Sequence, residues 1–380
     1  MLVVLCVPLW HSASRAQWIE DPAVDSVLQR GIYDIYNIEF DRADREFAQV
    51  VRLKPDHPAG YFFQAMTEWW RILTNFDDES QDRRYYGMLE KVIDMCDARL
   101  EKNENDVTAL FFKGGAVGFR GRLRANRGSW LKAANDGLIA LPAVRRAYQL
   151  EPDNYDVLLG MGIYNYYAEV VPDLYPIVKP FMIFLPSGDK KKGLEQLELA
   201  SQRARYARIE ATYFLLQTYF TYEKQYIRAL ELARELFNKF PRNPLFHRML
   251  GRCYVSIGYW GEAFKVFSEI EKRYYDHQEG YDTYDGREAY YYIGRHYFLT
   301  GKLDEALQNL YKCDDLSRRV DKEGASGFMS MANLTIGMIY DLQKRRTQAV
   351  AQYRKVLDMK EYENTHKDAE RYLEKPYSRN

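Results

Sequence analysis

The sequence holds little of what metal and acid–base chemistry needs. Its 380 residues include 6 histidines and 4 cysteines, and 54 lysines and arginines are balanced by 54 aspartates and glutamates. The shortage of imidazole and thiol ligands argues against a transition-metal site, and zero net charge argues against bulk electrostatic binding to nucleic acid. The patterns HExxH and GxSxG and a glycine-rich phosphate loop are missing too. We therefore expect no metal, no cofactor, no nucleic-acid partner and no catalytic residues.

A run of apolar residues long enough to span a membrane is also missing. The N-terminal MLVVLCVPLW is apolar but too short to cross a bilayer. Ser14 and Ala16 follow it and resemble a small-residue cleavage site before Gln17. These features predict a secretory signal peptide over residues 1–16 and an exported protein, periplasmic or envelope-associated. The alternative is an apolar N-terminal arm that stays on the folded chain.

We expect the few cysteines and the repeat histidines to be core residues. Without residues 1–16 the chain keeps Cys96, Cys253 and Cys313, an odd number with no paired spacing. We expect reduced, buried thiols rather than a disulfide framework or a zinc site. His247 and His296 fall inside expected helices, where we expect packed or hydrogen-bonded rings rather than catalytic bases.

Aromatic residues and a repeat are what the sequence does have. HRMLGRCYVSIGYWGEAFKVFSEI, YYYIGRHYFLTGKLDEALQNLYKC and NLTIGMIYDLQKRRTQAVAQYRKV follow one another at an offset of 43 residues. Matched positions carry Gly251, Gly294 and Gly337; Tyr254, Tyr297 and Tyr340; and Ala263, Ala306 and Ala349. A glycine inside a helix costs about 1 kcal/mol relative to alanine, so its recurrence at one phase needs a packing reason.

These segments resemble tetratricopeptide (TPR) repeats, helix pairs of about 34 residues whose pattern has Gly on the first helix and Ala on the second. Weaker copies centre on Gly31, Gly114, Gly160 (with Gly193) and Gln217, and a degenerate one has Ala65 in place of Gly. The resemblance implies an all-α, right-handed TPR-type α-solenoid of about eight helix pairs over residues 17–361. Residues 362–380 then form a polar capping helix and tail. The tyrosines at matched positions are expected to build helix interfaces.

Two successive repeats are longer than the pattern. Gly114 and Pro152 stand 38 residues apart where about 24 are expected, and Gly160 and Gly193 stand 33 apart where about 12 are expected. The extra residues fall at about 118–137 and 168–192. Insertions in neighbouring repeats should emerge at the same helix-to-helix turns and touch, and such insertions are often functional.

The first insertion is basic: no acidic residue lies between Asp106 and Asp136. Arg120, Arg124 and Arg127 share a helix face at i, i+4 and i+7. They could hold carboxylates or phosphates of a partner while Trp130 offers a ring for stacking. The alternatives are ion pairs with the chain's own acidic NFDDESQD segment, or a solvated surface. The glycines of the insertion are expected to loosen its backbone.

The second insertion interleaves four prolines with apolar residues over 170–186, so we expect an apolar loop or a broken short helix. It either folds back onto the repeats, docks on a partner, or dips into a membrane interface beside Lys190, Lys191 and Lys192. Tyr164 and Tyr167 lie one turn apart at its base, as a polar aromatic pocket or as core packing. The candidate partner-binding residues are Arg120, Arg122, Arg124, Arg127, Trp130, Lys132, Tyr164, Tyr167, Phe181 and Phe184.

The sequence thus predicts a non-catalytic exported scaffold or adaptor. The TPR resemblance implies a protein or peptide ligand in a concave groove, and the basic insertion favours an acidic one. Two alternatives remain: a peripheral membrane or envelope-assembly factor anchored through residues 170–186, and an enzyme with a pocket between the insertions.

Overall fold

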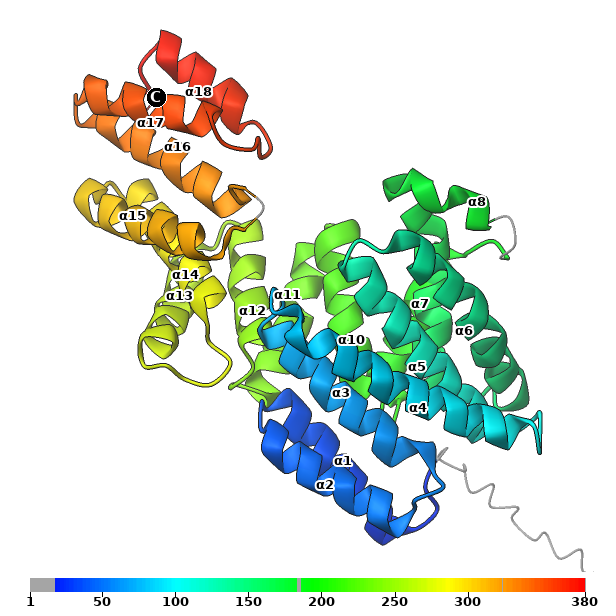
Figure 1. Cartoon of the computed structure of the whole chain (residues 1–380). Helices are drawn as coiled ribbons and strands as arrows, with labels where there is room; N and C mark the ends of the chain where they lie inside the picture. Colours follow the sequence, from blue (N-terminus) through cyan, green and yellow to red (C-terminus); the bar gives the residue numbers. More distant parts are fainter. Residues whose placement is uncertain (1–17, 183–185, 323, 380) are drawn as a thin grey trace, which may run out of the picture. The chain divides into compact units, whose positions relative to one another are not determined.

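The computed structural model describes residues 18–182, 186–322 and 324–379, and these residues form helices joined by turns and loops, with no strand (Figure 1). The all-α fold class is therefore confirmed. The predicted signal peptide, residues 1–16, lies outside the described residues.

Eight helix pairs follow one another along the described chain, as expected for a TPR-type α-solenoid. They are α1 (Pro22–Tyr36) and α2 (Phe40–Leu53), α3 (Pro58–Thr74) and α4 (Asp82–Leu100), α5 (Val107–Asn126) and α6 (Trp130–Leu150), α7 (Tyr155–Leu174) and α9 (Lys190–Arg203), α10 (Arg208–Gln217) and α11 (Tyr226–Lys239), α12 (Pro244–Ser256) and α13 (Trp260–Tyr275), α14 (Thr283–Leu299) and α15 (Leu303–Val320), and α16 (Gly327–Leu342) and α17 (Arg346–Leu357). The C-terminal helix α18 (Thr365–Glu374) packs on α16 and α17 within the predicted capping region. Short helical turns η1 (Glu79–Gln81), η2 (Pro176–Val178), α8 (Lys179–Met182) and the π-helix η3 (Thr218–Tyr222) complete the described elements.

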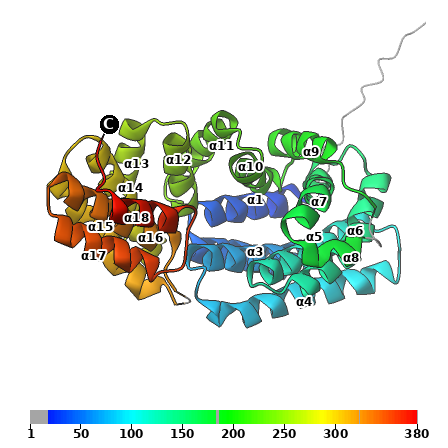
Figure 2. The ribbon, with the colours of Figure 1, turned by 90° about the horizontal axis from the view of Figure 1, so that it is seen from above.

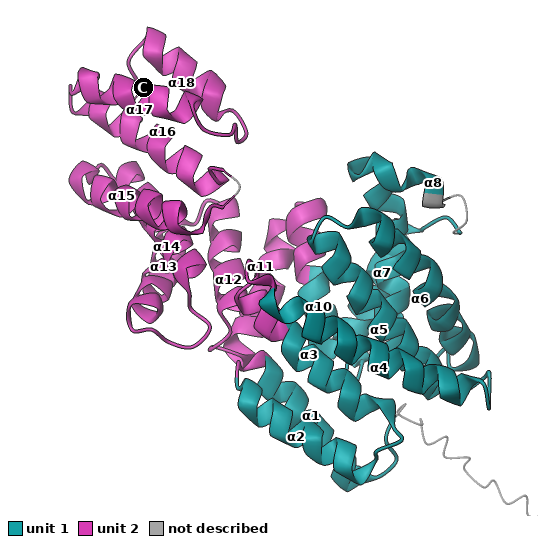
Figure 3. Ribbon diagram, viewed as in Figure 1, with its two compact units in different colours: residues 1–35, 39–69, 80–215 teal, residues 36–38, 70–79, 216–380 magenta. Residues whose placement is uncertain are grey.

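The helices form two compact units (Figure 3). Unit 1 contains the described residues of 1–35, 39–69 and 80–215, and unit 2 those of 36–38, 70–79 and 216–380. Within each unit the first helices of successive pairs lie side by side, such as α5 and α7 in unit 1 and α14 and α16 in unit 2 (Figure 2).

The repeated glycines mark the closest approach of the two helices in a pair. A Cβ atom placed on Gly251 would lie 2.7 Å from the ring of Phe267, and one on Gly337 would lie 2.5 Å from the ring of Tyr353. The matched alanines of the second helices, including Ala306 and Ala349, are fully buried. Gly294 instead approaches Leu310, at 2.8 Å, so the packing reason expected for the recurring glycine is a large side chain of the second helix.

A left-handed residue ends the first helix of several pairs, seven positions after the repeated glycine. It is Gly258 (φ 79°) and Gly301 (φ 84°) in two of the strong repeats, but Lys344 (φ 60°) in the third. The first pair has Ile38 there (φ 63°) and the fifth has Lys224 (φ 53°). The turn therefore requires a positive φ even where the side chain makes it costly.

The basic insertion does not form a loosened loop at the helix-to-helix turn, which corrects the expectation from its glycines. Its residues lengthen α5 and α6, and only Arg127–Ser129 lie between them. Gly121 lies within α5, and a Cβ atom there would be 3.0 Å from the Cβ atom of Asp136 on α6. Close packing of the two long helices therefore explains Gly121, and Gly128 (φ 72°) supplies the turn.

Two details of the fourth pair also differ from the sequence interpretation. The close approach to Gly193 is made by Gly162, whose carbonyl oxygen would lie 2.9 Å from a Cβ atom on Gly193, whereas Gly160 faces Val144 of α6. The prolines interrupt the helix later than expected, because α7 continues through Pro172 to Leu174. Beyond it the insertion is broken into η2 and α8, as expected.

Candidate binding sites

The arginine face of the first insertion is held by carboxylates of the chain itself. The Arg120 guanidinium donates to Asp136 Oδ1 at 2.6 and 3.1 Å and to Glu90 Oε1 at 2.7 Å. Arg120 is 8% exposed and Asp136 is fully buried. Although burial alone would lower it, the pKa of Arg120 is raised because of the hydrogen bonds to these two carboxylates.

The other two arginines of this face are paired in the same way. Arg124 donates to both carboxylate oxygens of Asp136 at 2.7 Å. Arg127 makes a two-pronged contact with Asp82, at 2.8 and 3.1 Å. Asp82 belongs to the acidic segment that the sequence offered as an internal partner, so the face braces α5 against α4 and α6.

Arg122 points to a different set of helices. Its guanidinium lies 3.0 Å from Glu210 Oε1 on α10, 4.0 Å from the ring centre of Phe214 and 4.9 Å from that of Trp69 on α3. An ion pair flanked by two aromatic faces is a strong setting for a guanidinium. Arg122 therefore joins the second, third and fifth helix pairs inside unit 1.

The two insertions touch, as the sequence predicts. The ring of Trp130, at the start of α6, stacks on Tyr175, between α7 and η2, with centroids 4.0 Å apart and planes 26° apart. Val178, the last residue of η2, is buried, but Leu131 is 51% exposed, Leu174 53% and Ile177 57%. We call Trp130, Leu131, Leu174, Tyr175 and Ile177 the insertion surface.

The remaining predicted site residues are Lys132, Tyr164, Tyr167, Phe181 and Phe184. Lys132 is exposed. The Tyr164 hydroxyl donates to the carbonyl oxygen of Pro186 and ties the returning chain to α7. The ring of Tyr167 packs edge-on against Tyr166. The side chain of Phe181 and all of Phe184 lie outside the described residues.

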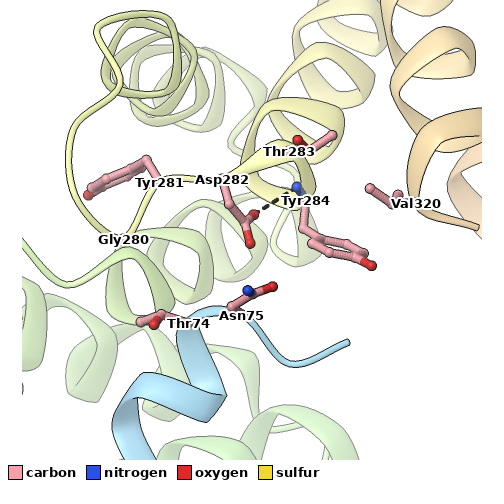
Figure 4. Close-up of a pocket in the computed structure, with 8 residues that line it drawn as sticks. All are labelled: Thr74, Asn75, Gly280, Tyr281, Asp282, Thr283, Tyr284 and Val320. Atoms are coloured by element: carbon pink, nitrogen blue, oxygen red, sulfur yellow. Dashed lines mark hydrogen bonds between the residues drawn. The ribbon is translucent and has the colours of Figure 1, made fainter. Parts of the chain in front are cut away.

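Unit 2 contains a cavity that the sequence did not predict (Figure 4). Its volume is about 380 Å³, at the small end of the range for ligand pockets, about 300–1,000 Å³. Thr74 and Asn75 line it from the end of α3, Gly280–Tyr284 from the start of α14, and Val320 from the end of α15.

Carboxylates shape the electrostatics of this cavity. Asp282 is the N-cap of α14: its Oδ1 accepts hydrogen bonds from the backbone N–H groups of Tyr284 at 2.8 Å and Asp285 at 3.3 Å. Asp285 lies 3.2 Å from Arg248 Nε, and its burial raises the pKa of its carboxyl to about 7. Burial also raises the pKa of Asp282. The Tyr284 hydroxyl donates to Asp77.

The sequence gives only a faint signal for this cavity. The pattern D-T-Y-D at 282–285 indicates a capped helix start. Asn75 lies about 200 residues earlier, in the degenerate second repeat, so the repeat pattern does not show that it lies beside Asp282.

The cysteines and the repeat histidines of the described residues are packed against other side chains. Cys96, Cys253 and Cys313 are buried free thiols, as expected, and burial raises the pKa of each to about 12. His247 stacks on Phe237 and hydrogen-bonds the Tyr281 hydroxyl at 3.0 Å, and His296 stacks on Phe264, which confirms both as packed rings.

In the part of the chain that the structure describes, no group of three or more His, Cys, Asp or Glu side chains could hold a metal ion. Across the described helices, none combines the length and the apolar character that crossing a membrane requires.

No protein-family model matches the chain, and no curated protein matches its sequence. Among solved structures it is similar to yeast Tom70, with 11% identity, a TM-score of 0.39, and coverage of 90% of this chain and 86% of that one. It is also similar to the human IFIT1 dimer with m7Gppp-AAAA, with 13% identity, a TM-score of 0.43, and coverage of 94% and 87%. The human IFIT1 dimer with PPP-AAAA has 13% identity and a TM-score of 0.43, with coverage of 94% of this chain and 86% of that one. Likenesses this weak indicate nothing about what the chain binds.

Proposed function

We propose that the chain is a non-catalytic scaffold that binds a partner protein on the insertion surface of unit 1. The observation that carries this proposal is the stack of Trp130 on Tyr175, which fixes η2 against the start of α6. The neighbouring Leu131, Leu174 and Ile177 stay more than half exposed, although burying such side chains is favourable. Contiguous exposed apolar patches mark interaction sites in soluble proteins.

The contact proposed here is apolar rather than acidic. Arg120, Arg124 and Arg127 would have to break ion pairs with Asp82, Glu90 and Asp136 before they could hold carboxylates of a partner. Removing one partner from such a buried pair costs about 3–5 kcal/mol. These ion pairs support a bracing role for the arginines. We therefore place the partner-binding surface on the apolar residues beside them.

A non-catalytic role rests on the state of the nucleophiles and bases. A thiol with a pKa near 12 is protonated at neutral pH and is a poor nucleophile. The pKa of His247 is lowered to about 3 by burial and by the charge of Arg273, so it is a weak base.

The test is a pull-down from detergent-solubilised envelope with wild-type chain and with the double variant Leu174→Asp, Ile177→Asp. The matched control is Ile227→Asp, because Ile227 belongs to unit 2 and is 60% exposed. A partner retained by the control and lost from the double variant supports the proposal. A partner retained equally by all three folded proteins, as judged by circular dichroism, would exclude the insertion surface.

A second candidate function is peripheral membrane binding through the same insertion. The observation that favours it is a set of exposed lysines near the apolar residues: Lys132, Lys179, Lys191 and Lys192. Basic residues beside a buried apolar anchor strengthen attachment to anionic lipids. Flotation of the chain with anionic vesicles, reduced by Leu174→Asp with Ile177→Asp, would favour this function over a protein partner.

We also propose that the chain is exported, on the composition of residues 1–16. Expression of the full-length chain followed by N-terminal sequencing should give a mature protein beginning at Gln17. A product that retains Met1 and stays in the cytoplasm would contradict export without affecting the proposed binding role.

A further inference from the structure

The last described residues of the chain lie on the ends of two earlier helices of unit 2. Residues 375–379, which we call the C-terminal tail, follow α18 and form no regular secondary structure. The backbone N–H of Tyr377 donates to Asp341 Oδ2 at 2.8 Å, near the end of α16. The Arg379 guanidinium donates to the carbonyl oxygen of Phe298, near the end of α14. The tail thus returns across α16 to α14.

Two side chains of the tail make its ring contacts. The Tyr377 ring lies 5.2 Å from the ring of Tyr372 on α18 and 6.1 Å from that of Phe298, between centroids. The Arg379 guanidinium lies 4.9 Å from the centre of the Phe298 ring. An aromatic face and the last carbonyl groups of a helix both attract a guanidinium. The tail is therefore recognised through a tyrosine and an arginine two residues apart, which share a face of an extended chain.

The helices hold the surface under the tail in place without it. Asp341 also accepts hydrogen bonds from Arg346 at 3.0 Å and from the Tyr353 hydroxyl at 2.8 Å, so its carboxylate stays fixed when the tail leaves. Phe298 belongs to α14 and Tyr372 to α18. Without the tail, these residues offer an aromatic wall, a carbonyl oxygen and a carboxylate oxygen. We call Phe298, Asp341 and Tyr372 the tail-binding surface.

Little of the tail is buried. Lys375, Pro376, Ser378 and Arg379 are exposed, and Tyr377 is half-buried. Chain ends with few buried contacts open at a small cost in free energy. The tail can therefore leave the surface while the helices of unit 2 stay folded.

We propose that the tail-binding surface binds an extended segment of a partner protein, and that the tail is an internal ligand which this segment displaces. The segment carries a tyrosine and, two residues later, an arginine. Its arginine donates to the Phe298 carbonyl, and the backbone N–H of its tyrosine donates to Asp341. An acidic residue in place of the arginine is disfavoured, because the C-terminal end of a helix carries partial negative charge.

The tail lowers the apparent affinity for such a segment. The surface is free only in the fraction of chains whose tail is released, and the apparent Kd is the intrinsic Kd divided by that fraction. Variants that detach the tail should therefore bind the segment more tightly than the wild type.

Three variants of the full-length chain test this. Tyr377→Ala with Arg379→Ala detaches the tail, and circular dichroism checks that the chain stays folded. Arg379→Ala alone removes an exposed side chain, so it stays informative if the double variant does not fold. Ser378→Ala is the matched control, because Ser378 is exposed between the two contact residues.

The probe is a labelled peptide with the sequence of residues 375–379, titrated by fluorescence anisotropy. It is taken to millimolar concentrations, since a tethered segment competes at an effective concentration of that order. We expect a Kd for the double variant at least tenfold below that of the wild type and of Ser378→Ala, with Arg379→Ala in between. Equal Kd values for the wild type and the double variant, or no binding to either tail variant, would overturn the proposal.

A second peptide, acetyl-Gly-Tyr-Gly-Arg-Gly-amide, tests the recognised chemistry. It should bind the double variant, and citrulline in place of its arginine should raise Kd at least tenfold. Binding of the tail peptide without binding of this one would overturn the assignment to a partner segment of this kind. So would a concentration-dependent dimer of the wild type, detected by light scattering and lost in Arg379→Ala, which would assign the surface to the tail of a second copy.

This surface belongs to unit 2, whereas the insertion surface belongs to unit 1. The peptide titrations therefore succeed or fail independently of the proposed function.

Discussion

Asp25, in the first turns of α1, accepts a hydrogen bond from the hydroxyl of Tyr206, 181 residues later in the chain. Arg205 donates to the other carboxylate oxygen, and Asp25 is 4% exposed. The first helix of unit 1 is thus fastened to the segment between α9 and α10. This contact joins the first helix pair of unit 1 to the segment between the fourth and fifth pairs, which are not its neighbours in the chain.

Replacing Asp25 by alanine should lower the free energy of unfolding of unit 1 by about 2–3 kcal/mol, because hydrogen bonds to a charged group are lost and Arg205 loses its partner. Tyr206→Phe removes one of the two contacts and should cost less. Urea unfolding followed by circular dichroism measures both. A cost for Tyr206→Phe equal to that of Asp25→Ala would show that the arginine contact contributes little.

Arg120→Ala should destabilise the chain by about 3 kcal/mol, since it leaves the buried Asp136 with Arg124 alone. A double-mutant cycle with Asp136→Asn should give a coupling energy of about 1 kcal/mol or more. Arg120→Ala with unchanged stability and a lost partner would instead support the partner-binding interpretation of the arginine face.

Two glycine-to-alanine substitutions should change the free energy of unfolding in opposite directions. Gly337→Ala places a Cβ atom 2.5 Å from the Tyr353 ring and should cost about 1–3 kcal/mol. Gly118→Ala, within α5, meets no atom within 4 Å and should stabilise the chain by about 0.5–1 kcal/mol. Thermal unfolding compares them, and destabilisation by both would mean that α5 needs the glycine for another reason.

Lys344→Gly should stabilise unit 2 by about 1 kcal/mol, because a lysine at φ 60° is in the left-handed region that glycine occupies without a Cβ clash. Gly258→Lys at the matched position (φ 79°) should destabilise it by a similar amount. Urea unfolding of the two variants measures both effects. A loss of stability on Lys344→Gly would show that the side chain contributes more than the turn costs.

His247 should make a contribution to stability that is lost as the pH falls from about 6.5 toward 3. Burial and Arg273 lower its pKa to about 3 in the folded chain, so the unfolded chain binds the proton more readily in this range. Glu269, 3.7 Å away, and the Tyr281 hydroxyl also face the ring. His247→Gln should flatten the acid limb of the stability curve.

The regular part of the fold could be predicted because it repeats. The 43-residue offset places Gly251, Gly294 and Gly337 on equivalent first helices, and each meets the second helix of its pair. Helix-pair packing is local in sequence, so a single pattern specifies it.

The sites could be predicted only in part. The contact of the two insertions followed from their places in successive repeats, but the partners of the arginines did not follow from spacing. Asp136 is the first carboxylate after a long stretch without one, a signal that could have identified it as the counter-ion. Asn75 and Asp282 lie about 200 residues apart and are joined by no periodicity, so only three-dimensional structure brings them together.

The carboxylate that Arg120 and Arg124 share places an evolutionary constraint on the insertion. Asp136 compensates two guanidinium groups while it is fully buried, so losing the acid would leave two positive charges facing a closed helix interface. Substitutions at 120, 124 and 136 should therefore arise together as this family of sequences diverges. Residues 127 and 82 should form a second covarying pair, and the basic stretch should change as a unit with its acidic counterparts.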